Sequence, residues 1–154
     1  MFNLSSNSIV TLKSSASLDL FSENTPYNFT NQLCTTLNYS NKTKVALSEI
    51  HLPLNFKDIN AQKNIKQIFV LCDLVDDSIV GSSRLSILKV ITVNPNIYFL
   101  NSQSELFQNL FFYPLTRNSI NNIKIVITDG FGNILQNNSK LTKFDETFVV
   151  LQFK

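Results

Sequence analysis

Apolar and polar residues alternate along several short stretches of this chain, and a period of two is the pattern of a β-strand with one buried face. The clearest stretch is Ile120–Thr128, in which Ile123, Ile125 and Ile127 fall on one face. An Asp-Gly dipeptide follows it directly and is typical of a tight turn. Short alternating stretches separated by turn residues predict an all-β protein.

Eight such stretches can be recognised in the 154 residues, a length that fits one domain. Eight is also the strand number of the jelly roll. We therefore expect a single domain over residues 1–154, folded as an eight-stranded jelly-roll sandwich of two four-stranded antiparallel sheets. The first, eighth, third and sixth strands would form one sheet, and the second, seventh, fourth and fifth the other. The predicted strands are Ser8–Lys13, Tyr27–Leu37, Thr43–Pro53, Lys66–Val75, Arg84–Val93, Leu106–Tyr113, Ile120–Thr128 and Glu146–Phe153.

Two segments between these strands are candidates for short helices. Ser102 and Glu105 have the spacing of a helix capping box, which predicts a single helical turn just before the sixth strand. The longest loop, Leu54–Ile65, is the second candidate. Neither segment changes the predicted fold class.

Two of the predicted strands do not alternate. Ile68–Val75 and Thr147–Phe153 are apolar on both faces, whereas a sandwich buries only one face of each sheet. A loop or another subunit must therefore cover the second face, because bare apolar patches are rare on monomers. The aromatic segment Leu110–Leu115 can be read either as core or as a subunit contact. The candidate subunit-interface residues are Phe69, Leu71, Phe111, Phe112, Tyr113, Phe148 and Val150.

Charge and composition exclude several classes of protein. The chain is 44% hydrophobic and only 16% charged, which argues against disorder. Its net charge of +2 gives no basic excess for a specific nucleic-acid partner. The longest apolar runs are too short to cross a membrane, so we expect no membrane insertion. The N-terminus lacks the basic and apolar regions of a signal peptide, so we expect a protein that is not secreted.

The residues that usually carry chemistry are scarce. His51 is the only histidine, and a nucleophile–histidine–acid triad would have to use it. Cys34 and Cys72 lie among apolar residues, and we expect both to be reduced core thiols. Three glycines form neither a phosphate-binding loop nor a dinucleotide motif. We therefore expect no enzyme activity, no cofactor and no metal site.

One acidic cluster leaves a choice open. Asp73, Asp76 and Asp77 follow each other closely at the end of the fourth predicted strand. A calcium site on a loop would use such oxygen ligands, but the spacing of an EF-hand is absent. A solvated strand end and turn is the better interpretation.

Three blocks of sequence resemble minor capsid (penton) proteins of Polinton/Maverick elements, adintovirus-like viruses and virophage-like elements. The first is Val70–Val75, followed by Val80-Gly81 and by Leu85–Val90, with a lysine where the family usually has arginine. The second is Phe112–Arg117, which is similar to the family's Tyr-x-Pro-Leu segment. The third, Phe148–Lys154, is similar to the family's terminal strand, and further matches extend over nearly the whole chain.

The resemblance implies a structural capsid protein with a single jelly-roll fold and no catalysis. Its partners would be four further copies in a homopentameric penton, and the surrounding double-jelly-roll major capsid protein. It would be located at the vertices of a virion assembled inside the host cell. The alternative is a jelly-roll carbohydrate- or receptor-binding module, which would expose clustered aromatic residues and hold calcium.

Overall fold

The structure is a computed structural model that describes residues 7–53, 65–93, 103–135 and 145–154. The described residues form eleven β-strands and no helix. Alternation of buried and exposed side chains is clear in β1, β10 and β11. The strands are β1 (Ser8–Lys13), β2 (Asn28–Asn38), β3 (Lys44–Leu52), β4 (Gln67–Cys72), β5 (Ser78–Val80), β6 (Ser83–Leu85), β7 (Ile87–Thr92), β8 (Gln103–Leu106), β9 (Tyr113–Pro114), β10 (Ser119–Asp129) and β11 (Phe148–Phe153).

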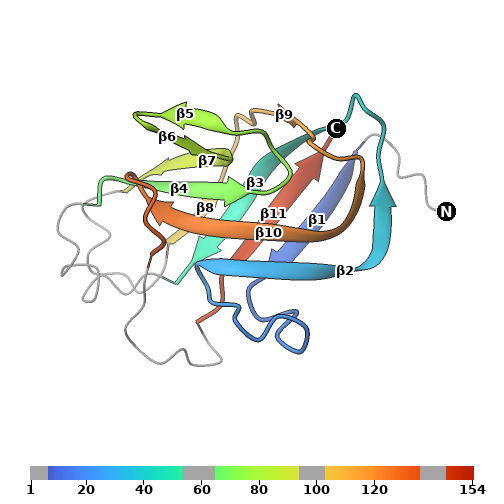
Figure 1. Cartoon of the computed structure of the whole chain (residues 1–154), viewed down its shortest axis with the longest axis horizontal. Helices are drawn as coiled ribbons and strands as arrows, with labels where there is room; N and C mark the ends of the chain where they lie inside the picture. Colours follow the sequence, from blue (N-terminus) through green and yellow to red (C-terminus); the bar gives the residue numbers. More distant parts are fainter. Residues whose placement is uncertain (1–6, 54–64, 94–102, 136–144) are drawn as a thin grey trace.

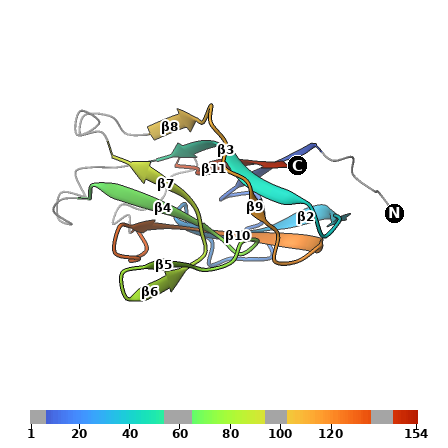
Figure 2. The same cartoon turned by 90° about the horizontal axis from the view of Figure 1, so that it is seen from above.

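Two antiparallel sheets pack face to face (Figure 1). One has the strand order β1-β11-β3-β8, and the two-residue strand β9 also pairs with β3. The other has the order β2-β10-β4-β7. A hairpin of β5 and β6 forms a third, two-stranded sheet, which lies on the outer side of the second sheet (Figure 2). Both termini of the described chain therefore belong to the same sheet, because β1 pairs with β11.

The strand order of the four-stranded sheet agrees with the sequence-based prediction, and in the other large sheet β8 takes the place expected for the sixth strand, but the predicted number of strands is wrong. Eleven strands form sheets of five, four and two, where eight strands in two sheets of four were expected. The predicted strand Arg84–Val93 is divided at Ser86 into β6 and β7. The additional strand β5 pairs with β6 through a turn at Gly81, whose φ of 59° is in the left-handed region.

The sixth predicted strand and the helical turn before it are both wrong in detail. Gln103–Leu106 is strand β8, which pairs with β3 through Glu49–Leu52. The pairing with β3 replaces the local hydrogen bonds that a capping box would make. The strand was expected to begin at Leu106, but β8 already ends there. Of the expected range Leu106–Tyr113, only Tyr113 at its far end pairs with β3 again, as part of β9 (Tyr113–Pro114). The other helix candidate, Leu54–Ile65, lies almost entirely outside the described residues.

The core lies between the two large sheets. Ile123, Ile125 and Ile127 are fully buried, as the alternation predicted. From the other sheet, Val149 and Leu151 of β11 point to the same core. Burying an aliphatic side chain of this size contributes about 1.5–3 kcal/mol relative to leaving it exposed. One cluster of buried residues drawn from both sheets is therefore the main source of stability.

Asparagine side chains form hydrogen bonds with backbone groups on the free edges of β1 and β2. The Asn31 amide accepts a hydrogen bond from the Lys13 backbone N–H (2.7 Å) and donates one to the Lys13 carbonyl (2.8 Å). The Asn24 amide makes the same pair of bonds with the backbone of Thr30, both at 2.9 Å. Each amide thus takes the place of a neighbouring strand, which protects an edge that could otherwise pair with another chain.

Candidate subunit interface

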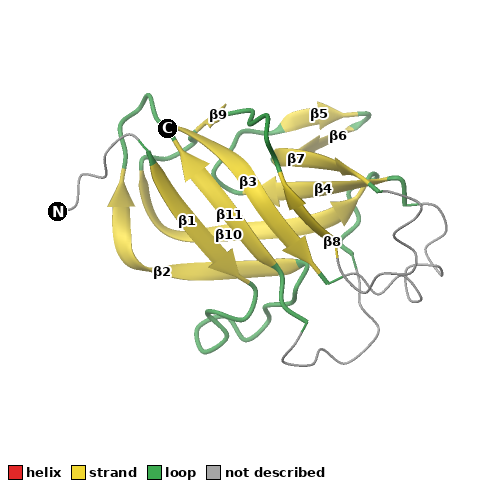
Figure 3. Cartoon of the chain, turned by 180° about the vertical axis from the view of Figure 1, so that it is seen from behind, coloured by secondary structure: helices red, strands yellow, loops and turns green. Residues whose placement is uncertain are grey.

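The outer face of the five-stranded sheet carries two of the predicted interface residues, Phe148 and Val150. Figure 3 shows this sheet from its outer side. The residues that alternate with them in β11 point into the core, so Phe148 and Val150 point outward, where both side chains are half-buried. The Phe148 ring stacks on His51 of β3, with ring centroids 5.4 Å apart. Ile9 and Leu106 are exposed on the two flanking strands of the same sheet, which makes this face partly apolar.

His51 lies on this face as the cross-strand partner of Phe148 and Ser104. Its Nδ1 is 2.6 Å from the Ser104 hydroxyl, on the neighbouring strand β8. Its ring is covered by Phe148. Stacking and one hydrogen bond to neighbouring strands account for the position of the imidazole.

A second surface, which we call the aromatic edge, contains three of the predicted interface residues. It consists of Phe111, Phe112 and Tyr113, together with Lys44 and Lys154. Phe111 is 67% exposed, and its ring lies 4.7 Å from that of Tyr113. The Lys154 Nζ is 5.7 Å from the centre of the Phe112 ring, close enough for a cation–π attraction. The sequence left core and subunit contact open for this segment: Tyr113 and Leu115 pack against the core, whereas Phe111 is exposed and available for a contact.

The aromatic edge is held in place by β3. Tyr113 and Pro114 pair with Val45 and Lys44, and the backbone of Lys44 bonds to that of Lys154 on its other side. The positions of both lysines and of the aromatic side chains are therefore set by one strand in the middle of the five-stranded sheet. The exposed side chains of Lys44 and Lys154 add positive charge to this edge.

The remaining predicted residues, Phe69 and Leu71, lie on the outer face of β4. Phe69 is only 4% exposed and Leu71 is half-buried. The neighbouring strand β7 adds Ile87, which is also buried but does not belong to the central core cluster. The β5–β6 hairpin lies on this side of the sheet (Figure 2). The chain therefore covers the second face of β4 itself and leaves Phe69 little surface for contact with another subunit.

The hairpin exposes apolar residues of its own. We call the surface formed by Asp76, Asp77, Ile79 and Arg84 the hairpin face. Phe131 is 87% exposed, and the glycine that follows it approaches Leu85 of β6. Asp76, Asp77 and Arg84 line an open depression of about 580 Å³. No periodic pattern in the sequence identifies Ile79 or Phe131, because each is a single apolar residue in or beside a turn.

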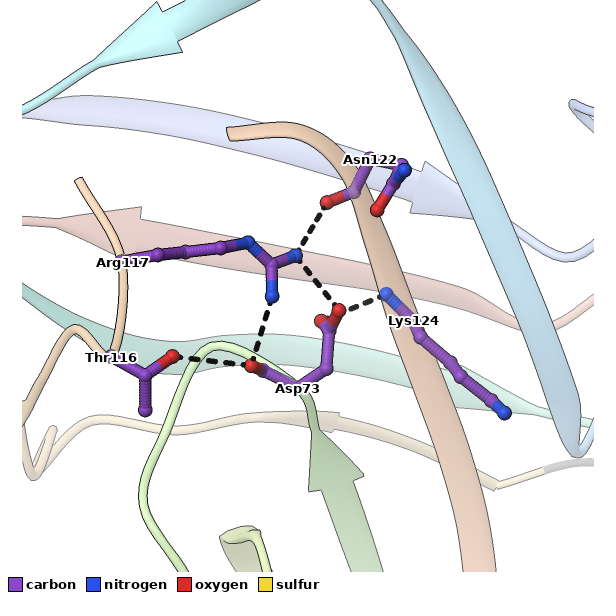
Figure 4. A network of polar contacts seen from close by, with 5 residues as sticks. All are labelled: Asp73, Thr116, Arg117, Asn122 and Lys124. Atoms are coloured by element: carbon purple, nitrogen blue, oxygen red, sulfur yellow. Dashed lines mark hydrogen bonds and ion pairs between the residues drawn. The ribbon is translucent and has the colours of Figure 1, made fainter. Parts of the chain in front are cut away.

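Asp73 belongs to a structural network that joins three segments (Figure 4). The Arg117 guanidinium donates to the Asp73 carboxylate at 2.8 Å, to the Asp73 carbonyl at 3.2 Å and to the Asn122 carbonyl at 2.9 Å. The second carboxylate oxygen accepts a bond from the Lys124 backbone N–H at 3.0 Å. Thr116 donates its hydroxyl to the Asp73 carbonyl. Asp73 thereby fixes the turn after β4 against β10, which explains why this predicted strand end is ordered.

The two cysteines have different environments. Cys72 is buried in the core, and burial raises the pKa of its thiol to about 12. Cys34 is exposed on β2, so the prediction that both cysteines are core thiols is wrong for Cys34. The apolar neighbours of Cys34 in sequence alternate with it in the strand and point elsewhere. Both thiols are free.

Comparison with known proteins adds no relationship: no protein-family model matches this chain, and no curated protein matches it. The resemblance to minor capsid proteins therefore rests on the sequence motifs alone. Within the described ranges there is no group of three or more histidine, cysteine, aspartate or glutamate side chains that could hold a metal ion. The same part of the chain contains no helix long and apolar enough to cross a membrane.

Proposed function

We propose that this chain is a structural capsid protein with a single jelly-roll fold, which forms the homopentameric penton at the vertices of an icosahedral virion. The observation that carries the proposal is the strand order of the two large sheets, β1-β11-β3-β8 and β2-β10-β4-β7. In this order the last strand pairs with the first, as in the jelly roll, a fold common in viral capsid proteins. β5, β6 and β9 are additions at the periphery of that arrangement.

The network around Asp73 supports the resemblance on which the vertex role depends. Asp73 belongs to the first block of resembling sequence and Arg117 to the second, and the two side chains form an ion pair at 2.8 Å. Pro114, also in the second block, pairs with Lys44 at the edge of the five-stranded sheet. Two of the blocks thus join parts of the fold that are distant in the chain.

A penton is a closed ring, in which each subunit uses two different surfaces to contact its neighbours. The described residues include separate exposed apolar regions that could take these roles, on the aromatic edge and at Ile9 of β1. The outer face of the five-stranded sheet offers a further surface for a double-jelly-roll major capsid protein. Such a subunit would assemble inside the host cell, and its role would require no catalysis and no cofactor.

The test is the native mass in solution, measured by light scattering after size exclusion, with negative-stain images of the same peak. Five copies of the 17.5 kDa chain give about 88 kDa. A ring of five at this mass is the expected result. A trimer would contradict the penton and favour the receptor-binding module, for which glycan arrays and calcium-dependent melting are the next measurements. A monomer at every concentration, also in mixtures with a major capsid protein, would contradict the proposal.

A further inference from the structure

Part of the free edge of β1 is open to a second chain. In an antiparallel pair, the backbone N–H and C=O groups of every second residue point toward the partner strand, and those of the other residues point away. The Asn31 side chain bonds both backbone groups of Lys13, so these groups point away from β11. The same direction holds two and four residues earlier, for Thr11 and Ile9. In the described part of the chain, no hydrogen bond reaches the backbone of Thr11 or Ile9 from that side.

β8 forms the opposite edge of the same sheet (Figure 3). Phe107 donates its backbone N–H to the Ser48 carbonyl, so the backbone groups of Leu106 and Ser104 point away from β3. Within the ranges that the structure describes, these groups also have no backbone partner on their outer side. β9 pairs with β3 on the same side as β8, since β11 occupies the other side. The aromatic edge therefore continues the edge that β8 forms.

Both edges expose an apolar side chain on the outer face of the sheet. Ile9 of β1 is 69% exposed, and Leu106 of β8 is 73% exposed. An unpaired edge with an exposed apolar residue is a template for pairing with another chain, and proteins usually protect such edges. Each subunit of a closed ring needs two different and complementary surfaces. The two opposite edges of one sheet meet this requirement.

We infer that β1 of one copy pairs with β8 of the next copy, so that the five-stranded sheets continue from subunit to subunit around the ring. This inference rests on the proposed function and identifies its subunit contact. β1 and β8 run in opposite directions, because three antiparallel pairings separate them in the sheet. Copies placed side by side in the same orientation therefore join as antiparallel strands. One register joins the outward groups of both edges, with Ile9 opposite Leu106 and Thr11 opposite Ser104.

This register also matches the side chains. Ile9 and Leu106 cover each other, which removes exposed apolar surface from water. The hydroxyl groups of Thr11 and Ser104 lie opposite each other, a cross-strand combination that stabilises antiparallel sheets. Backbone hydrogen bonds supply the affinity when a strand is added to an edge, and the side chains give the specificity. Beyond Leu106 the chain leads to the aromatic edge, so the exposed Phe111 is an anchor near the start of β1 of the next copy.

The first test removes a backbone donor from the free edge of β1. Variant T11P lacks the N–H that bonds to β8 of the next copy, and an edge strand tolerates proline where this N–H faces solvent. We expect the dissociation constant of the oligomer to rise by about tenfold or more, because a buried carbonyl is left unpaired. The matched control is T92P. Val93 donates its N–H to the Lys66 carbonyl, so Thr92 has the same outward position on the free edge of β7. Light scattering over a concentration series measures assembly, and circular dichroism checks the fold.

The second test traps the contact in the assembled ring. Opposite residues of a hydrogen-bonded antiparallel pair have Cα atoms about 5.5 Å apart, a distance that a disulfide spans. The variant C34S/I9C/L106C, which lacks the exposed native thiol, should give covalent oligomers up to the pentamer on a non-reducing gel after oxidation. The control C34S/I9C/I79C places the second thiol at another exposed position, on the β5–β6 hairpin, and should give no such ladder.

The two tests separate this contact from the proposed function. A ring that T11P weakens, and that the disulfide of I9C/L106C closes covalently, confirms the contact and its register. If the wild type forms a ring but T11P assembles like T92P, or I9C/L106C gives no more covalent product than I9C/I79C, this contact is wrong and the penton stands. If the wild type forms no oligomer, the proposed function fails and the contact fails with it.

Discussion

The amide of Asn31 is buried, and it makes both of its hydrogen bonds with the backbone of Lys13 in the opposite sheet. Replacing it by alanine in variant N31A leaves the Lys13 N–H without a partner, whereas the Lys13 carbonyl keeps its hydrogen bond from the Ala16 N–H. An unsatisfied buried polar group costs about 1–3 kcal/mol, and we expect N31A to lower the free energy of unfolding by that amount. Urea denaturation measures the change. Variant N121A, at an exposed position of β10, is the control, and an equal loss in both variants would contradict this role of Asn31.

Because of Cys72, the stability of the fold should decrease at alkaline pH. Burial raises the pKa of its thiol to about 12 in the folded protein, above its ordinary value of 9.0. As the pH rises, the thiol loses its proton at a lower pH in the unfolded chain than in the folded protein. The contribution of Cys72 to the free energy of unfolding is therefore complete below pH 9 and is lost as the pH rises from about 9 to about 12. The loss should approach roughly 1.4 kcal/mol per pH unit in that window.

The measurement compares the pH dependence of unfolding in the wild type and in variant C72A. Stability of the wild type should fall more steeply above pH 9, because C72A has no thiol at this position to ionise. In the folded protein a thiol reagent should modify Cys34 and not Cys72, since a thiolate is the reactive form. Identical pH profiles, or modification of both thiols in the native state, would show that Cys72 is more accessible than the structure indicates.

At the scale of strands, periodicity predicted most elements and the order of the two large sheets. The alternation in Ile120–Thr128 was sufficient because every second residue from Ile123 to Ile127 is a buried isoleucine. The region around β8 was not predictable in this way, since Ser102 and Glu105 carry a local helix signal that pairing with β3 overrides. The apolar second face of β4 correctly indicated a cover. The segment that covers this face could not be predicted, because the β5–β6 hairpin reaches it only through the fold. Contacts between segments distant in the chain produce no periodic pattern in the sequence.

The turn after β10 lies against the β5–β6 hairpin, and Gly132 determines the shape of this turn. Its φ of 87° is in the left-handed region, and a Cβ added there would lie 3.4 Å from Leu85 of β6. Variant G132A should therefore lose about 1 kcal/mol of unfolding free energy, mainly from backbone strain. Thermal or urea unfolding measures the loss. Variant G130A is the matched control, because its backbone has no positive φ and its Cβ would meet Gln67 at 3.6 Å. A larger loss in G130A would contradict this assignment.

At the scale of the whole molecule, the candidate interface was predictable only in part. Phe111, Phe112 and Tyr113 were identified because aromatic residues are concentrated in one segment. The exposed residues Ile79 and Phe131 were missed, since each is a single apolar residue in or beside a turn. Phe69 has the same apolar character as Phe148, and only the fold distinguishes the buried Phe69 from the half-buried Phe148.

The proposed assembly separates the stability of the subunit from the stability of the ring. Phe111 is 67% exposed in a single chain, so variant F111S should change the unfolding free energy of the monomer by no more than about 0.5 kcal/mol. The same substitution removes an aromatic anchor from the proposed contact, and such anchors commonly contribute about 2 kcal/mol or more. Light scattering should therefore show a large loss of assembly, while urea unfolding at low concentration shows almost none.

Leu20 provides the control for this experiment, because it is also 67% exposed and lies in the segment between β1 and β2. Variant L20S removes exposed apolar surface of comparable kind outside the proposed contact, so its oligomer should match that of the wild type. If L20S and F111S weaken assembly equally, loss of general surface hydrophobicity is the cause, and the aromatic edge has no special role. If F111S alone dissociates the ring, and a monomer with unchanged stability remains, the ring depends on a surface that the fold itself does not need.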